Sequence, residues 1–143
     1  MLKAIIIDDE PDCVRLLALQ LKMYCKEVDV VASCTESVEG LEKIRTYQPD
    51  IVFLDIEMPV MNGFQLLEKL SNIDFSLVFV TAYDEFAVKA FRFNAMDYLL
   101  KPIDGKELKR VVEKASQSRP RVQQIQSVKQ QLQNSDKQWP EKI

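Results

Sequence analysis

The chain has 143 residues, of which 47% are hydrophobic and 29% are charged. It can therefore build one hydrophobic core without disulfides or a structural metal. Histidine is absent, which excludes Ser-His-Asp and Cys-His nucleophile systems and every zinc site with an imidazole ligand. The net charge of −3 divides into −6 over residues 1–115 and +3 over residues 116–143. The acidic part is expected to repel nucleic acid.

Cysteine usage and the absence of long apolar stretches predict the compartment. Cys13, Cys25 and Cys34 are too few and too irregularly spaced for a disulfide framework or a Cys-x-x-Cys metal site. We expect them to be reduced and buried. No run of 18 apolar residues occurs, and the N-terminus lacks the pattern of a signal peptide. The sequence therefore predicts a cytoplasmic protein with no membrane contact.

Five short apolar runs predict β-strands. Each run is nearly continuous rather than alternating, which is typical of parallel strands that are covered on both faces. Because five strand-helix units are too few for a closed barrel, we expect an open α/β fold. The prediction is a flavodoxin-like, doubly wound five-stranded parallel sheet in the order 2-1-3-4-5, with helices on both faces. The predicted strands are residues 4–7, 28–32, 51–54, 77–80 and 98–100.

Apolar residues at helical spacing predict a helix after each strand. The Ser33 to Glu36 cluster is typical of a helix cap, and it precedes a helix whose Val38, Leu41 and Ile44 are expected to face the core. The last helix is expected to begin after Asp104, which is a good N-cap residue. The other predicted helices are residues 14–24, 64–70 and 84–94.

From about Ser116 the alternating pattern ends. Residues 117–138 contain eight glutamines, and their apolar residues form only a thin stripe. We predict one domain over residues 1–117, followed by a polar, Gln-rich linker or helical extension over residues 118–143. A short coiled-coil stem is the alternative for this tail.

Polar residues follow four of the five predicted strands. Asp8 and Asp9 follow the first strand, Asp55 the third, Thr81 the fourth and Lys101 the fifth. In an open α/β sheet these strand ends line one crevice, so the side chains are expected to converge. Carboxylates held so close repel one another unless a cation lies among them, and oxygen ligands alone favour Mg²⁺. Carboxylates with Mg²⁺, a hydroxyl and a lysine ammonium are suited to binding a phosphoryl group. Asp55 would be the nucleophile, and an ionised carboxylate needs no general base.

Four segments stand in order at the ends of the predicted strands. They are residues 6–11 (IIDDEP), 50–63 (DIVFLDIEMPVMNG), 80–83 (VTAY) and 97–102 (DYLLKP). Together they resemble the receiver domain of two-component response regulators, over residues 3 to about 117. The run 79–103 is similar in particular to regulators with a LytTR-type (LytR/AlgR) DNA-binding output domain.

The resemblance implies a role for each site residue. Asp55 is expected to accept a phosphoryl group from a histidine kinase or a small phosphodonor. Asp8 and Asp9 are expected to hold Mg²⁺ with Asp55, and the backbone carbonyl of Glu57 is a further implied ligand. Thr81 is expected to bind the phosphoryl oxygen.

The same resemblance implies a switch. Lys101 is expected to pair with the phosphoryl group, with its direction fixed by a cis peptide bond to Pro102. Tyr98 is expected to turn inward as Thr81 moves. Phosphorylation is then expected to promote homodimerisation through the segment 84–94, where Val88, Phe91 and Phe93 offer an apolar surface. DNA binding is expected only through an output domain that these 143 residues do not include.

Three alternatives are weighed against this interpretation. A stand-alone receiver or phosphorelay protein has the same site without an output domain. A phosphatase of the haloacid dehalogenase type also uses Asp, Mg²⁺ and Lys, but its motif follows the first strand, and here Asp55 follows the third. FMN binding is disfavoured because Asp8-Asp9-Glu10-Pro11 occupies the phosphate-loop position. We therefore predict a phosphoacceptor signalling domain rather than an enzyme.

Overall fold

Strands and helices alternate along residues 1–118, the part of the chain that the computed structural model describes. All but the first residue of the predicted 118–143 linker lies outside the described residues. The elements are β1 (Leu2–Ile7), α1 (Pro11–Tyr24), β2 (Val28–Cys34), α2 (Ser37–Tyr47), β3 (Ile51–Leu54), α3 (Gly63–Glu68), β4 (Ser76–Thr81), the 3₁₀ helix η1 (Asp84–Phe86), α4 (Ala87–Arg92), β5 (Asp97–Leu100) and α5 (Gly105–Ser118).

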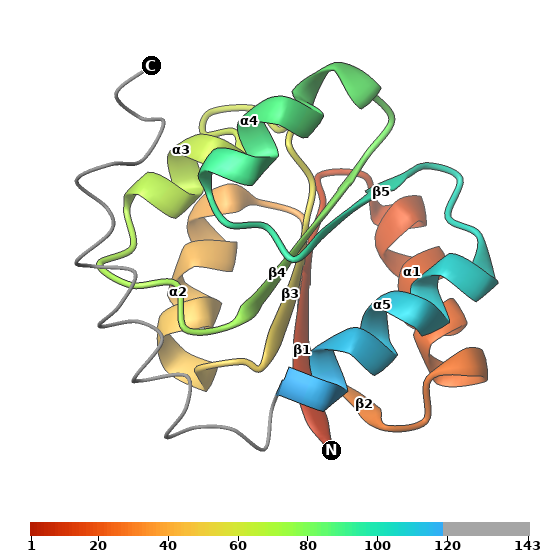
Figure 1. Cartoon of the computed structure of the whole chain (residues 1–143). Helices are drawn as coiled ribbons and strands as arrows, with labels where there is room; N and C mark the ends of the chain where they lie inside the picture. The colour runs from red at the N-terminus through yellow and green to blue at the C-terminus, as the bar shows by residue number, and fades with distance from the viewer. Residues whose placement is uncertain (119–143) are drawn as a thin grey trace.

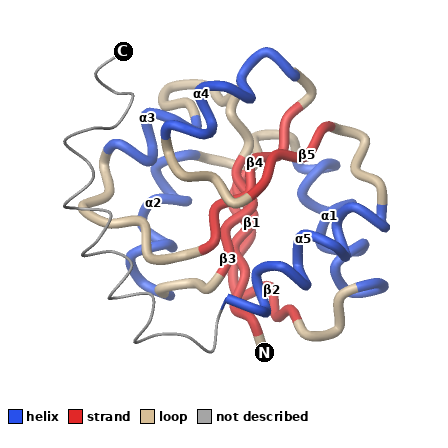
Figure 2. Tube along the Cα trace, in the orientation of Figure 1, coloured by secondary structure: helices blue, strands red, loops and turns tan. Residues whose placement is uncertain are grey.

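The five strands form one sheet in the order β2-β1-β3-β4-β5. All four neighbouring pairs are parallel, and the strands run through the middle of the molecule between layers of helices (Figure 2). The predicted fold class and strand order are therefore confirmed. β1 pairs with both β2 and β3, and β3 pairs with both β1 and β4. The residues that follow β1 and β3 are thus brought to the centre of the carboxyl edge.

Each face of the sheet carries its own hydrophobic core. Helices α1 and α5 cover one face, and α2, α3 and α4 cover the other (Figure 1). On the first face, Leu17 and Leu21 of α1 pack with Val111 of α5 against the strands. On the second face, Phe64 lies in an aromatic cluster. Its ring centroid is 5.1 Å from that of Phe79 and 5.2 Å from that of Phe93. Covering both faces explains why the strands read as continuous apolar runs.

Helix starts follow the local sequence. Pro11 stands at the beginning of α1, where its missing N–H needs no partner. Asn62 and Gln65 form a capping box at the start of α3. The predicted cap of the last helix is confirmed, because the Lys106 backbone N–H donates to Asp104 Oδ1 at 3.0 Å.

Two predictions about side chains and one about a helix differ from the structure. Val38, predicted to face the core, is 53% exposed on α2, where only Ser37, Gly40 and Ile44 are buried. The predicted helix 84–94 divides into η1 and the short α4. Phe93, predicted to offer a partner surface, instead stacks on Phe64 because it lies at the end of α4, where the chain turns back toward the sheet.

Two further predictions concern the cysteines and the membrane. The three cysteines are free, but only Cys25 and Cys34 are buried, whereas Cys13 is half-buried. Among residues 1–118, none of the helices combines the length and the apolar character needed to cross a bilayer.

Candidate functional site

Strand ends bring the predicted site residues together at the carboxyl edge of the sheet. Asp8 and Asp9 follow β1, Asp55 follows β3, Thr81 ends β4 and Lys101 follows β5. The backbone fixes these positions: the Asp55 N–H donates to the Ile7 carbonyl at 2.9 Å, and the Lys101 N–H donates to the Thr81 carbonyl at 2.8 Å. The site is thus built on backbone held by the sheet.

Three carboxylates form the centre of the site. One oxygen from each of Asp8, Asp9 and Asp55 lies within 4.8 Å of the other two. Asp8 and Asp55 are only 4% exposed, and Asp9 is half-buried. Three carboxylate oxygens at this spacing fit a hard divalent cation such as Mg²⁺, which takes oxygen ligands and keeps several waters.

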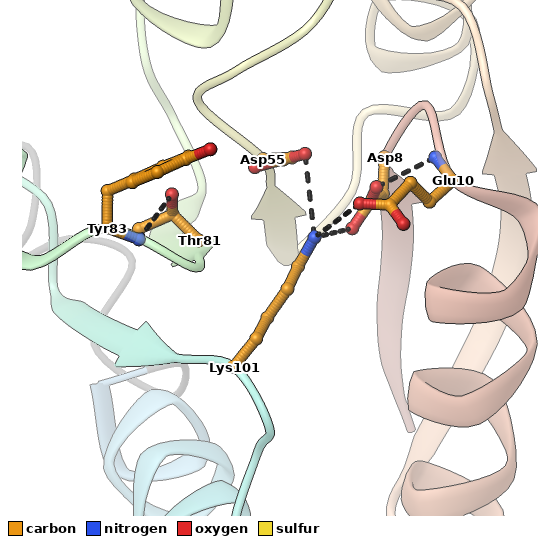
Figure 3. Close-up of polar contacts among 6 residues, drawn as sticks. All are labelled: Asp8, Glu10, Asp55, Thr81, Tyr83 and Lys101. Atoms are coloured by element: carbon orange, nitrogen blue, oxygen red, sulfur yellow. Dashed lines mark hydrogen bonds and ion pairs between the residues drawn. The ribbon is translucent and has the colours of Figure 1, made fainter.

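Lys101 extends into this carboxylate cluster from the segment that follows β5 (Figure 3). Its Nζ lies 2.8 Å from Asp8, 3.6 Å from Asp55 and 4.0 Å from Glu10. The peptide bond to Pro102 is cis, as predicted. Glu10 was given no role from the sequence, because only its position after the Asp pair distinguishes it. In the structure Glu10 is exposed.

Burial and neighbouring charge shift the ionisation of the site. Burial and the charge of Asp8 raise the pKa of Asp55 to about 7, although Lys101 opposes the rise. Burial lowers the pKa of Lys101, but its hydrogen bond to Asp8 and the charge of Asp55 outweigh this, so that the pKa lies above its ordinary value. Lys101 is therefore charged at neutral pH, whereas Asp55 is only partly ionised there, and a further positive charge nearby would favour its ionised form.

The loop after Asp55 packs tightly against it. The Gly63 N–H donates to the Ile56 carbonyl at 2.9 Å, and a Cβ at Gly63 would lie 2.5 Å from the Asp55 carbonyl oxygen. Only glycine fits there. Val60, at the tip of this loop, is 95% exposed and has φ of 70°, which is unusual for a β-branched residue. Met58-Pro59 and Asn62-Gly63 are turn-forming pairs in the sequence, but the sequence does not indicate either contact of Gly63.

Thr81 and Tyr98 are linked through the backbone of Tyr83. Thr81 is fully buried, and its Oγ1 accepts from the Tyr83 N–H at 3.3 Å. The Tyr98 hydroxyl donates to the Tyr83 carbonyl, and its ring centroid lies 6.4 Å from that of Phe79. Tyr83 was given no role from the sequence. Figure 3 shows its ring extending from the backbone beside Thr81 toward the Asp55 side of the site.

A cavity of about 460 Å³ adjoins the carboxylate cluster. Its walls include Asp55, Lys101 and Tyr83, and also Glu57, whose side chain is exposed. The ligand predicted at Glu57 is its backbone carbonyl, and this stays a prediction. A larger cavity of about 510 Å³ lies near the start of β3, between residues 44–50 and 70–75, and is lined by none of the predicted site residues. The smaller cavity is therefore the one relevant to the chemistry.

Comparison with known proteins identifies the family. Residues 4–113 match the model of the response regulator receiver domain. An uncharacterized response regulatory protein of Vibrio vulnificus is 42% identical over 119 residues, which are 82% of this chain and 49% of that protein. The transcriptional regulatory protein BtsR of Escherichia coli is 38% identical over 123 residues, 83% of this chain and 50% of that protein. The chain thus spans about half the length of the curated relatives it matches.

Solved structures agree with these relatives. The response regulatory domain of mrkE from Klebsiella pneumoniae superposes with a TM-score of 0.74 at 29% identity, covering 81% of this chain and 96% of that one. The receiver domain of AraT, a response regulator from Geobacillus stearothermophilus, has a TM-score of 0.68 at 32% identity, covering 87% and 98%. With its carboxylates, threonine and lysine gathered at the carboxyl edge of a 2-1-3-4-5 sheet, the chain belongs to the family of response regulator receiver domains of two-component systems.

Proposed function

We propose that this domain accepts a phosphoryl group on Asp55 from a histidine kinase and thereby switches a longer regulator. The observation that carries the proposal is the placement of one buried carboxylate, Asp55, between two acidic neighbours and the ammonium of Lys101. An ionised carboxylate can attack phosphorus without a general base, which suits a chain that has no histidine. The product is an acyl phosphate on Asp55.

We further propose that Asp8, Asp9 and Asp55 hold Mg²⁺, with the backbone carbonyl of Glu57 as a fourth ligand. The spacing and burial of the three carboxylates support this ligand set. When bound, the ion supplies positive charge that offsets the negative charge of the carboxylates and of an incoming phosphoryl group. The raised pKa of Asp55 supports this need, because a protonated carboxyl is not a nucleophile.

Lys101 and Thr81 are proposed to bind the phosphoryl oxygens. Lys101 lies nearer to Asp8 than to Asp55, at 2.8 Å against 3.6 Å. We propose that it shifts toward Asp55 when a phosphoryl group adds charge there. Thr81 leaves its contact with the Tyr83 N–H to do the same. Because both residues contact the phosphoryl group in one state only, they supply the difference in affinity that a population shift requires.

Tyr98 is proposed to transmit this change to the surface. Its hydroxyl is bonded to the backbone of Tyr83, two residues after Thr81, so a movement of Thr81 reaches it directly. Tyr98 adjoins a cavity of about 420 Å³ that Phe91 of α4 also lines. Val88 and Phe91 are 71% and 74% exposed, and we propose that they form part of the surface through which the phosphorylated domain dimerises.

The regulator is proposed to act on DNA through an output domain of the LytTR type. The resemblance over residues 79–103 supports this type, and the name of the BtsR relative supports transcriptional regulation. The 143 residues themselves are not expected to bind DNA, because residues 1–115 carry a net charge of −6. Coverage of only half of each relative supports a longer regulator over a stand-alone receiver or phosphorelay protein. We propose that this regulator is cytoplasmic.

Labelling with a small phosphodonor tests the proposal. We expect phosphoramidate and Mg²⁺ to add one phosphoryl group per chain, measured by intact mass, and chelation of Mg²⁺ to prevent this. Asp55→Asn should remove the label because the amide cannot form an acyl phosphate. Asp12→Asn is the matched control, since the Asp12 side chain is 90% exposed on α1. Full labelling of Asp55→Asn would contradict the proposal.

A further inference from the structure

Another cavity lies against Lys101, between α1 and the loop that follows β5. Its volume is about 260 Å³, and its wall is mostly carbon. Asp8, a member of the carboxylate cluster, and its ion-pair partner Lys101 both line this cavity. The apolar lining residues are Leu16, Leu17, Val80, Pro102 and Ile103.

Gln20 lines this cavity, and its side chain carries a buried acceptor that is not used. Its Nε2 donates to the Ile103 carbonyl at 2.9 Å, which leaves Oε1 of the same amide as the remaining acceptor. Its Oε1 is buried and accepts no hydrogen bond, and among residues 1–118 it is the only buried side-chain nitrogen or oxygen found in this condition. Since a buried acceptor without a partner is costly, a donor that enters the cavity gains a bond that the protein alone does not make.

The charges and the volume define the chemical class of ligand. Asp8 and Lys101 are already paired at 2.8 Å, so the polar end of the cavity offers no unpaired charge to an ion. Sites for drug-sized molecules occupy roughly 300–1,000 Å³ and combine apolar walls with a few polar groups. This cavity has that composition at a smaller size. It therefore suits a small, uncharged ligand.

We propose that this cavity binds a small, uncharged, mainly apolar molecule carrying one N–H or O–H donor, which bonds to Gln20 Oε1 after a slight turn of the amide. The assignment does not depend on phosphorylation. Because Lys101 and Asp8 form one wall, however, the ligand contacts two residues of the proposed phosphoacceptor site. Such a molecule can therefore alter the position of Lys101.

Two probes of the same shape test the assignment on the full 143-residue chain. Indole is an apolar bicycle with one N–H donor, and benzofuran has the same shape with an oxygen in place of the N–H. In NMR titrations we expect indole to shift the methyl signals of Leu17 and Val80 and the side-chain amide of Gln20. We expect indole to bind roughly 3- to 10-fold more tightly than benzofuran, the ratio that one net hydrogen bond gives.

Two variants test the contribution of the Gln20 acceptor and that of the cavity separately. Gln20→Met keeps the length of the side chain without the amide, so the two probes should bind it equally. Leu16→Trp should fill the mouth and weaken both probes, and it should fold because Leu16 is half-exposed. The comparison of the two probes on the wild-type chain stands even if a variant is unstable. Three results would overturn the proposal. The first is no shift with either probe, which leaves water as the occupant. The others are equal binding of both probes by the wild-type chain and a preference for indole that persists in Gln20→Met.

Discussion

The carboxylate cluster and the segment 84–94 differ in how firmly the fold holds them. Asp8 and Asp55 are 4% exposed at the ends of β1 and β3, and their backbone N–H groups are hydrogen-bonded to neighbouring strands. The segment 84–94 is a three-residue 3₁₀ helix followed by a six-residue α-helix, of which only Ala90 is buried. The chemistry is thus placed on fixed backbone, and the surface proposed to change is placed where little packing resists a change.

Mg²⁺ should give the largest change in stability, because it acts on the fixed region. We expect the melting temperature to rise with Mg²⁺. At a hundredfold excess of Mg²⁺ over Kd, binding should raise the free energy of unfolding by roughly 2.7 kcal/mol. Without Mg²⁺, Asp9→Asn should be more stable than the wild-type chain because one of three close carboxylates loses its charge. Differential scanning calorimetry measures both. A melting temperature that stays constant across millimolar Mg²⁺ would rule out the metal site.

Gly63→Ala should be the next largest effect. The added Cβ would lie 2.5 Å from the Asp55 carbonyl oxygen, which the sheet prevents from moving, so we expect a loss of about 1–3 kcal/mol in denaturant unfolding. Gly105→Ala is the matched control. Its Cβ would approach only the Tyr24 ring at 2.9 Å, and this ring is half-exposed and can turn away. Equal effects of the two substitutions would mean that the loop beside Asp55 is not rigid.

Stability without Mg²⁺ should depend on pH through Asp55. Its pKa is about 7 in the folded chain against an ordinary value of 3.8. Between these two pH values the Asp55 carboxyl therefore holds a proton in the folded state that it has lost in the unfolded state. Stability should therefore fall as the pH rises from about 4 to 7 and level off above. Asp55→Asn removes this contribution, and its stability should decline less over that range. Parallel curves for the two chains would show that Asp55 is not desolvated as described.

The smallest effect on stability is expected at the exposed segment. Phe91→Ser should change the free energy of unfolding by no more than about 0.5 kcal/mol, because Phe91 is 74% exposed. The same variant should weaken the dimer that beryllofluoride, a phosphoryl mimic, is expected to induce, as measured by sedimentation. A wild-type chain that stays monomeric with beryllofluoride would contradict the proposed dimer surface.

Sequence pattern was sufficient for the sheet and for the placement of the site. Continuous apolar runs such as 4–7 and 51–54 predicted the strands, because parallel strands are covered on both faces. The convergence of Asp8, Asp55, Thr81 and Lys101 followed from the strand order alone. Asp9 joins them because it is the next residue after Asp8.

What the sequence did not indicate depends on contacts between distant parts of the chain. Apolar periodicity does not distinguish Phe93, which stacks on Phe64, from Phe91, which is exposed. The positive φ of Val60 has no local signal, since a β-branched residue normally avoids it. The hydrogen bond from Tyr98 to the Tyr83 carbonyl requires the positions of both loops at once.

The location of the phosphoryl group tests the central claim most directly. Borohydride reduces an aspartyl phosphate to homoserine, so the chain can be labelled with phosphoramidate and Mg²⁺, reduced, digested and sequenced by mass spectrometry. The account predicts homoserine at position 55 and unchanged aspartate at positions 8 and 9, because Asp55 alone is the proposed nucleophile. Homoserine at position 8 or 9, or a phosphoryl group on any other residue, would contradict it.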